Sequence, residues 1–210
     1  MMRGAFITLE GGEGVGKSTN LSFVADTLKA TGRDVLTTRE PGGTPLGERI
    51  RSWILEGDHG RLSAEVEALL MFAARAQHLE QVIRPALAAG RWVVCDRFTD
   101  ATFAYQGGGR GANPALLRNL RAEIQQGLEP DLTLLLDAPL DVGSGRIAER
   151  VPDHFEREQR PFFERVRNAY LQLAAENSAR IKIVNASQPL SAVQTQIAVQ
   201  LDALAARFQP

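Results

Sequence analysis

The 210-residue chain has one cysteine, few aromatic residues and almost no net charge. A lone Cys95 excludes an internal disulfide framework and fits a reducing compartment, so we expect a cytoplasmic protein. With 24 basic and 25 acidic side chains, the net charge of −1 gives no global attraction to nucleic acid or to an anionic membrane surface. No apolar run reaches the length of a membrane span, and the N-terminus lacks a signal-peptide pattern. From these absences we expect that the protein binds neither nucleic acid nor a membrane.

Short apolar runs alternate with longer segments of helical pattern along the chain. The runs that indicate strands lie at 5–9, 34–38, 92–95, 132–136 and 181–184. All but the second are nearly continuous in apolar residues, which is typical of strands covered on both faces. This alternation predicts an α/β fold in three layers, with a five-stranded parallel sheet flanked by helices. The length and the 44% hydrophobic content favour a single domain over residues 1–210.

The most informative motif is a glycine-rich loop between the first strand and the first helix. The run Gly11-Gly12-Glu13-Gly14-Val15-Gly16-Lys17-Ser18 matches G-x-x-x-x-G-K-[ST], the pattern of a P-loop. A helical pattern follows from Thr19 to Ala30, so backbone N–H groups and a helix N-terminus point at a phosphate chain. We expect residues 11–19 to bind the phosphate chain of a nucleotide, with Lys17 on the β- and γ-phosphates and the Ser18 hydroxyl on Mg²⁺.

Charged residues follow the other strands at the same edge of the predicted sheet. Asp96 and Arg97 come directly after the third run, so they face the same crevice as the P-loop. Arg97 is a bidentate donor for a phosphate, whereas Asp96 either binds a Mg²⁺-bound water or orients Arg97. Asp137 ends the fourth run and competes with Asp96 for the metal. The segment Arg39-Glu40-Pro41-Gly42-Gly43-Thr44 follows the second run as a strand-to-helix turn.

Three further segments carry candidate residues with two interpretations each. Phe72 and Arg75 lie three residues apart in a helical stretch, so a ring and a guanidinium share a face as a flat base requires, although a lone Phe is normally core. We expect His78 to be a surface or packing residue. The glycines at 107–109 disfavour a helix and predict a flexible loop or a close approach. The charged segment 141–167 is either a solvated face or a mobile lid that brings arginines to phosphate.

The chain resembles the thymidylate kinase family of P-loop nucleoside monophosphate kinases in four motifs, which occur in the same order along the sequence. They lie at 8–19, 39–44, 70–78 and 96–111, and the resemblance spans nearly the whole chain. It implies a P-loop NTPase fold with a small lid at about 143–160, transfer of phosphate from ATP to dTMP with Mg²⁺, and a homodimer. The long apolar helix at 66–87 offers a surface for such a dimer.

The resemblance also implies roles for individual residues. On the donor side, Glu13 lies near the phosphates and the metal, with Asp96 near Mg²⁺. The implied acceptor site has Arg39, Arg51 and Arg97 on the dTMP phosphate, Phe72 stacked on thymine, Arg75 on the edge of the base, and Thr102, Tyr105 and Gln106 on base and sugar. In the lid, His154 stands where the family usually has an arginine. Arg146, Arg150 and Arg157 are the candidates to replace it, and of these Arg150 is the expected catalytic arginine.

Two alternatives stay open on the sequence. The chain is either a thymidylate kinase or a kinase for another deoxynucleoside monophosphate or a nucleoside, which differs only in the acceptor. A P-loop protein that binds nucleotide without turnover is the alternative from another class. A guanine-specific N-K-x-D run is absent from the sequence, which argues against a GTPase switch.

Overall fold

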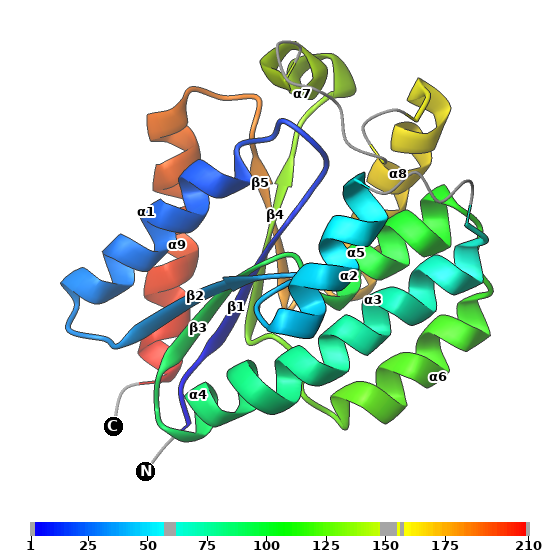
Figure 1. The fold of residues 1–210 in the computed structure, drawn as a ribbon. Helices are drawn as coiled ribbons and strands as arrows, with labels where there is room; N and C mark the ends of the chain where they lie inside the picture. Colours follow the sequence, from blue (N-terminus) through cyan, green and yellow to red (C-terminus); the bar gives the residue numbers. More distant parts are fainter. Residues whose placement is uncertain (1–2, 57–61, 148–154, 156–157, 209–210) are drawn as a thin grey trace.

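The computed structural model describes residues 3–56, 62–147, 155 and 158–208. Its centre is a sheet of five strands in the order β2-β3-β1-β4-β5, with every neighbouring pair parallel (Figure 1). The strands are β1 (Phe6–Glu10), β2 (Val35–Arg39), β3 (Trp92–Asp96), β4 (Leu132–Asp137) and β5 (Ile181–Asn185). Their bounds differ from the predicted runs by at most one residue at either end. The predicted five-stranded parallel sheet is confirmed.

The register of the sheet brings the candidate residues to one edge. β1 is central and pairs with β3 and β4, and all of its residues are buried. Leu9 of β1 and Arg39 of β2 both align with Asp96 of β3. The carboxyl ends of these three strands are therefore level, and the loops that follow them meet at the same place.

Helices cover both faces of the sheet, which gives the three layers that the sequence predicts (Figure 1). On one face, α1 (Lys17–Ala30) and α9 (Leu190–Arg207) share a hydrophobic core cluster with β1 and β4. The remaining helical elements are α2 (Pro45–Glu56), α3 (Ala64–His78), the π-helix η1 (Leu79–Ile83), α4 (Arg84–Ala88), α5 (Thr99–Thr102), the π-helix η2 (Phe103–Gly109), α6 (Pro114–Gln125), α7 (Leu140–Ile147) and α8 (Arg160–Glu176).

Local sequence signals set where the helices begin. The Ser63 hydroxyl accepts a hydrogen bond from the Val66 N–H at 3.3 Å and so caps α3. The Thr44 hydroxyl accepts one from the Gly47 N–H at 3.0 Å, and Pro45 is the first residue of α2. Both caps satisfy N–H groups that have no partner within their helix.

The glycines at 107–109 do not form the flexible loop that is one of the two predictions for them. They belong to η2, which packs against α8. A Cβ on Gly109 would lie 2.5 Å from the Phe162 ring, and one on Gly108 would lie 2.5 Å from the Ala169 Cβ. The glycines therefore serve the close approach of α8, and packing overrides their poor helix propensity.

Within the described ranges, no helix has both the length and the apolar character of a membrane span. Cys95 is fully buried in β3 and packs in a core cluster with Phe6 and Val93, so it is a small core residue.

Candidate active site

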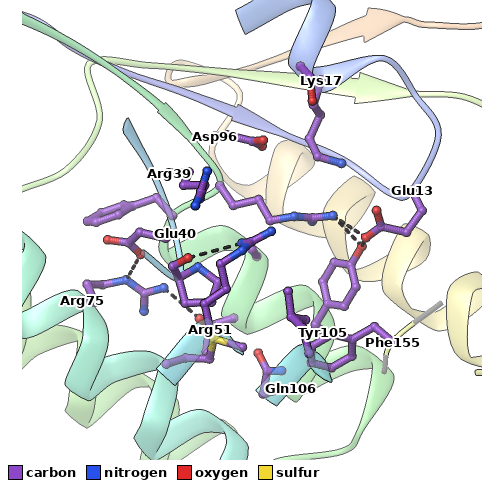
Figure 2. Close-up of a pocket in the computed structure, with 18 of the residues that line it drawn as sticks. Glu13, Lys17, Arg39, Glu40, Arg51, Arg75, Asp96, Tyr105, Gln106 and Phe155 are labelled. Carbon is purple, nitrogen blue, oxygen red and sulfur yellow. Dashed lines mark hydrogen bonds and ion pairs between the residues drawn. The ribbon is translucent and has the colours of Figure 1, made fainter. Parts of the chain in front are cut away.

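A cavity of about 470 Å³ opens where the P-loop meets the ends of β2 and β3 (Figure 2). Its lining comes from each of the motifs singled out in the sequence. Five of the lining side chains are cations, namely Lys17, Arg39, Arg51, Arg75 and Arg97, and three are anions, namely Glu13, Glu40 and Asp96. An excess of positive charge in one concave site fits ligands that carry phosphate.

The P-loop depends on glycine conformations at its turn into α1. Gly16 has φ +89° and Gly14 has φ +69°, and a Cβ on Gly14 would lie 2.1 Å from the Gly143 carbonyl oxygen. Residues Glu13, Gly14, Gly16, Lys17, Ser18 and Thr19 line the cavity. Gly11, Gly12 and Val15 lie behind it, and the Val15 side chain packs in the core, so Val15 offers only backbone groups to a ligand.

The Lys17 side chain folds back onto the P-loop. Its Nζ donates hydrogen bonds to the carbonyl oxygens of Gly11 at 3.2 Å and Gly12 at 2.6 Å. Burial, followed by the charge of Arg97, lowers the pKa of Lys17 to about 8. The ammonium is thus held at the cavity wall by neutral acceptors that a phosphate oxygen can replace.

Arg97 links the P-loop to η2 and α8. Its φ of +65° is uncommon for a non-glycine residue. The guanidinium donates to the Gly11 carbonyl at 3.0 Å, to the Tyr170 hydroxyl at 3.3 Å and to the Glu13 carboxylate. It also lies over the Tyr105 ring, 4.7 Å from the centroid, and the Tyr105 hydroxyl donates to Glu13 at 2.7 Å. Glu13, Arg97 and Tyr105 therefore form one connected group beside the P-loop.

Asp96 is the strand-end carboxylate that faces the cavity. Its Oδ1 is buried and has no hydrogen-bond partner within the described part of the chain. The carboxylate of Asp137, by contrast, accepts hydrogen bonds from Nε and Nη2 of Arg167 at 2.7 and 2.8 Å, and Asp137 does not line this cavity. A buried acceptor without a partner fits a hydrated cation, so the geometry favours Asp96 over Asp137 for the metal.

The described residues contain no group of three or more His, Cys, Asp or Glu side chains that would hold a metal by itself. Ser18 lines the cavity along with Asp96. This sparse donor set fits Mg²⁺, which usually takes one or two protein ligands together with substrate phosphates and water.

At the other end of the cavity, Arg75 is almost completely buried, with 2% of its side chain exposed. Its Nε donates to Glu40 Oε2 at 2.7 Å, and its Nη2 donates to the Thr102 hydroxyl at 3.0 Å. The rings of Phe72 and Phe98 lie against the guanidinium, at 4.7 and 5.2 Å. Nη1 alone has no hydrogen-bond partner among the described residues, so one fixed donor remains for a ligand.

Two more arginines line the cavity between these ends. Arg39 pairs with Glu48 at 2.8 Å, whereas Arg51 forms no ion pair within the described ranges and donates to the Pro41 carbonyl at 3.3 Å. Burial, followed by the charge of Arg39, lowers the pKa of Arg51. Two like charges in one wall favour an anion between them.

The thymidylate kinase family model matches the chain over residues 9–197. This chain belongs to the thymidylate kinase family.

Individual relatives agree over nearly the full length. The thymidylate kinase of Methylococcus capsulatus is 57% identical over 98% of this chain and 99% of its own. That of Chromohalobacter salexigens is 56% identical over 96% of each chain. The crystal structure of thymidylate kinase from Ehrlichia chaffeensis is similar with a TM-score of 0.78 and 30% identity, covering 95% of this chain and 99% of that one. The predicted P-loop NTPase fold and the predicted family are confirmed.

In this thymidylate kinase family member, the cavity wall near Arg75 differs from the expectation for Phe72. The Phe72 ring is 1% exposed, does not line the cavity, and packs with Ala68 and Leu117. Met71 lines the cavity instead, four residues before Arg75. Because positions i and i+4 share a helix face, this spacing was the available signal for Met71.

The other expected acceptor residues, Thr102, Tyr105 and Gln106, all line the cavity. Besides Met71, the sequence interpretation missed the apolar wall residues Leu55, Phe98, Ala101 and Phe155. His78 is fully buried and bonded through both ring nitrogens, so it is a packing residue and not a surface one.

The expected lid arginine is not placed. Arg150, His154 and Arg157 lie outside the described residues, as does the side chain of Arg146.

Proposed function

We propose that the chain transfers the γ-phosphate of ATP to dTMP, forming ADP and dTDP. One observation carries the proposal: a single cavity has the P-loop lysine at one end and a buried guanidinium with one free donor at the other. Figure 2 shows Arg75 and Gln106 at the end away from Lys17. This arrangement fits an acceptor nucleotide whose phosphate faces ATP and whose base is read at the far end. Membership of the family supports the same reaction.

On the donor side, the P-loop residues 11–19 hold the phosphates of ATP, and Lys17 exchanges its loop carbonyls for phosphate oxygens. The Ser18 hydroxyl and the free Oδ1 of Asp96 would hold Mg²⁺. When bound, the metal supplies positive charge to the transferring phosphate.

On the acceptor side, Arg39, Arg51 and Arg97 hold the phosphate of dTMP. The attacking phosphate oxygen is ionised at neutral pH, so no general base is required. Arg97 and Lys17 stabilise the charge that spreads over the transferring group, and Glu13 fixes Arg97. Arg150 is the proposed lid arginine.

The base is selected by the fixed donor of Arg75. A guanidinium has no acceptor, so Nη1 favours a ring carbonyl, as in thymine or uracil, over the amino group of cytosine. Met71 supplies an apolar face for the ring, while Thr102, Gln106 and Tyr105 lie on its edges and on the sugar side. Phe72 acts in this proposal as the support of Arg75 and not as the stacking surface.

The test is a coupled assay of ADP release with dTMP, dUMP, dCMP and thymidine at equal concentrations. We expect dTMP to be fastest and dUMP slower. We expect dCMP to be poor because it offers Arg75 a donor, and thymidine inactive because it lacks the attacking phosphate. Equal rates with all four would refute the assigned acceptor. Binding of ATP and dTMP without turnover would instead support the nucleotide-binding alternative.

We further propose that residues 1–210 form one kinase domain with a lid at about 143–160, which acts as a homodimer in the cytoplasm. Large apolar side chains are exposed on α2 and α3, which pack together. They are Leu46, Trp53, Val66 and Leu69, each 41–48% exposed. Light scattering should give twice the chain mass of 22.9 kDa, and Leu69→Glu should lower it to that of one chain. A single-chain mass for the unaltered protein would contradict the dimer.

A further inference from the structure

Behind the base-reading arginine lies a chain of buried polar groups that ends at His78. His78 is fully buried and does not line the cavity. Its Nδ1 lies 3.0 Å from Glu40 Oε1, and its Nε2 lies 2.7 Å from the Thr38 hydroxyl. The second oxygen of Glu40 accepts from Arg75 Nε at 2.7 Å. The hydrogen-bonded chain therefore runs from Thr38 through His78 and Glu40 to Arg75, and it ends at the free Nη1 of Arg75.

The two residues on α3 hold one carboxylate from both sides. Arg75 and His78 lie three residues apart in the last turn of α3, so they share a face of the helix. Glu40 follows β2, is 4% exposed, and meets each of them with a different oxygen. A buried carboxylate is costly unless both oxygens have partners. With both oxygens engaged, its plane is fixed, and so is the Nε that it accepts from.

The direction of Nη1 follows from these contacts. A guanidinium is planar, so fixing Nε and Nη2 also fixes Nη1. Glu40 holds Nε and Thr102 holds Nη2, while Phe72 and Phe98 cover the faces. Of these partners, the carboxylate makes the charge-assisted hydrogen bond, which is the strongest of the set. Loss of the His78 hydrogen bond would leave Glu40 free to turn and would release Nε.

We propose that Glu40 and His78 are positioning residues for base selection: His78 orients Glu40, and Glu40 orients Arg75 so that its free donor meets the ring carbonyl of the acceptor. The inference rests on the proposed function. His78 does not reach the cavity, so its effect on the base passes through two other side chains. The pair should govern the KM for dTMP and the choice of base, and it should leave the ATP site unaffected.

The test uses two substitutions that keep opposite halves of the imidazole. In His78→Asn the amide nitrogen occupies the place of Nδ1 and keeps the hydrogen bond to Glu40. In His78→Gln it occupies the place of Nε2 and keeps only the contact with Thr38. Both variants remove one ring from the same buried site, so they are matched for loss of packing. Glu40→Gln tests the next link in the chain, because it keeps the shape of the carboxylate and removes its charge.

The readout is the ratio of kcat/KM for dTMP to that for dCMP, together with the KM for ATP. Both substrates are measured on one sample, so a lower folded fraction cancels in the ratio. We expect His78→Gln and Glu40→Gln to lower the ratio by about tenfold, the value of one charge-assisted hydrogen bond. His78→Asn should stay within about threefold of the unaltered protein, and the KM for ATP should change by less than about twofold in all three.

Three results would overturn the inference. The first is an unchanged ratio in His78→Gln and Glu40→Gln. The second is an equal fall in both His78 variants, which would indicate packing alone. The third is a KM for ATP that rises together with the KM for dTMP. If the unaltered protein prefers neither dTMP nor dCMP, the proposed base recognition itself is wrong, and the inference falls with it.

Discussion

The guanidinium of Arg75 lies over the ring of Phe72, with its central carbon 4.7 Å from the ring centroid. The ring thus stacks on a cation of the protein itself, a contact that stabilises both groups. Its other neighbours in the core include Ala68 and Leu117. The only large side chain that α3 presents to the cavity besides Arg75, within the described residues, is that of Met71. Of these two neighbours on α3, Met71 and not Phe72 therefore contributes to the cavity wall near Arg75.

Met71→Ala should raise the KM for dTMP by about tenfold, because roughly 1.5 kcal/mol of apolar contact with the base is lost. The KM for ATP should stay the same, since Met71 lies at the other end of the cavity. Steady-state kinetics with each substrate varied in turn would measure both. Phe72→Ala is the matched comparison, and it should lower the melting temperature more than Met71→Ala does, because Phe72 is larger and more deeply buried. An unchanged KM for dTMP in Met71→Ala would place the base elsewhere.

ATP binding should take up protons near pH 8. The pKa of Lys17 is lowered to about 8, so roughly half of the lysines are neutral at that pH without nucleotide. Bound phosphate favours the ammonium, so ATP binding should take up about half a proton at pH 8 and much less at about pH 6.5. Calorimetry in two buffers of different ionisation enthalpy measures this uptake. Lys17→Arg stays charged and should show none. The same uptake in that variant would assign the proton to another group.

Glu10 should make the protein less stable as the pH rises. It is fully buried at the end of β1, where its carboxyl accepts from the Phe98 N–H at 2.7 Å and the Tyr170 hydroxyl at 2.8 Å. Burial, followed by the Asp100 carboxylate, raises the pKa of Glu10 from 4.5 to about 8. Between these values the folded chain keeps a proton that the unfolded chain has lost, so the free energy of unfolding falls with pH.

The size of this effect is up to about 1.4 kcal/mol per pH unit between the two pKa values. Glu10→Gln has no titratable group at this position. Its free energy of unfolding should therefore lack this part of the dependence on pH. Urea unfolding of both proteins at several pH values from about 5 to 8 would measure the difference. A difference in unfolding free energy that is constant across this range would show that Glu10 is ionised in the folded state.

The packing of α8 on η2 should depend on Gly109. In Gly109→Ala the new Cβ would lie 2.5 Å from the Phe162 ring and 2.9 Å from the Val166 side chain, so α8 has to move. We expect a loss of about 1–3 kcal/mol in the free energy of unfolding. In the control Gly107→Ala, the nearest atom is the end of the Leu117 side chain at 3.1 Å, which can shift. Equal losses in the two variants would argue against close approach as the reason for the glycine.

The strands and the P-loop were predictable because local pattern determines them. Buried parallel strands have continuous apolar runs, and the loop has its own glycine spacing. Strand ends of a parallel sheet meet at one edge, so Asp96 and Arg39 were also placed correctly at the cavity.

The register of α3 and the burial of His78 depend on distant parts of the chain. Met71 and Phe72 are both apolar, and contact with Leu117 of α6 decides which of them turns away from the cavity. The partners of His78 are Thr38 and Glu40, which come from the end of β2 about 40 residues earlier. Likewise, the glycines of η2 lie in a helix because Ala169 and Phe162 of α8 pack closely against Gly108 and Gly109, and α8 is more than 50 residues away in the sequence.

The most direct test of the account is to identify the product when the protein is incubated with ATP, Mg²⁺ and dTMP. Phosphorus NMR spectroscopy should show dTDP and ADP formed in equal amounts, with neither formed when dTMP is left out. Lys17→Ala should give neither product while its circular dichroism spectrum remains that of the folded protein. ADP released at the same rate without dTMP, or dTMP left unchanged while both nucleotides bind, would contradict the account.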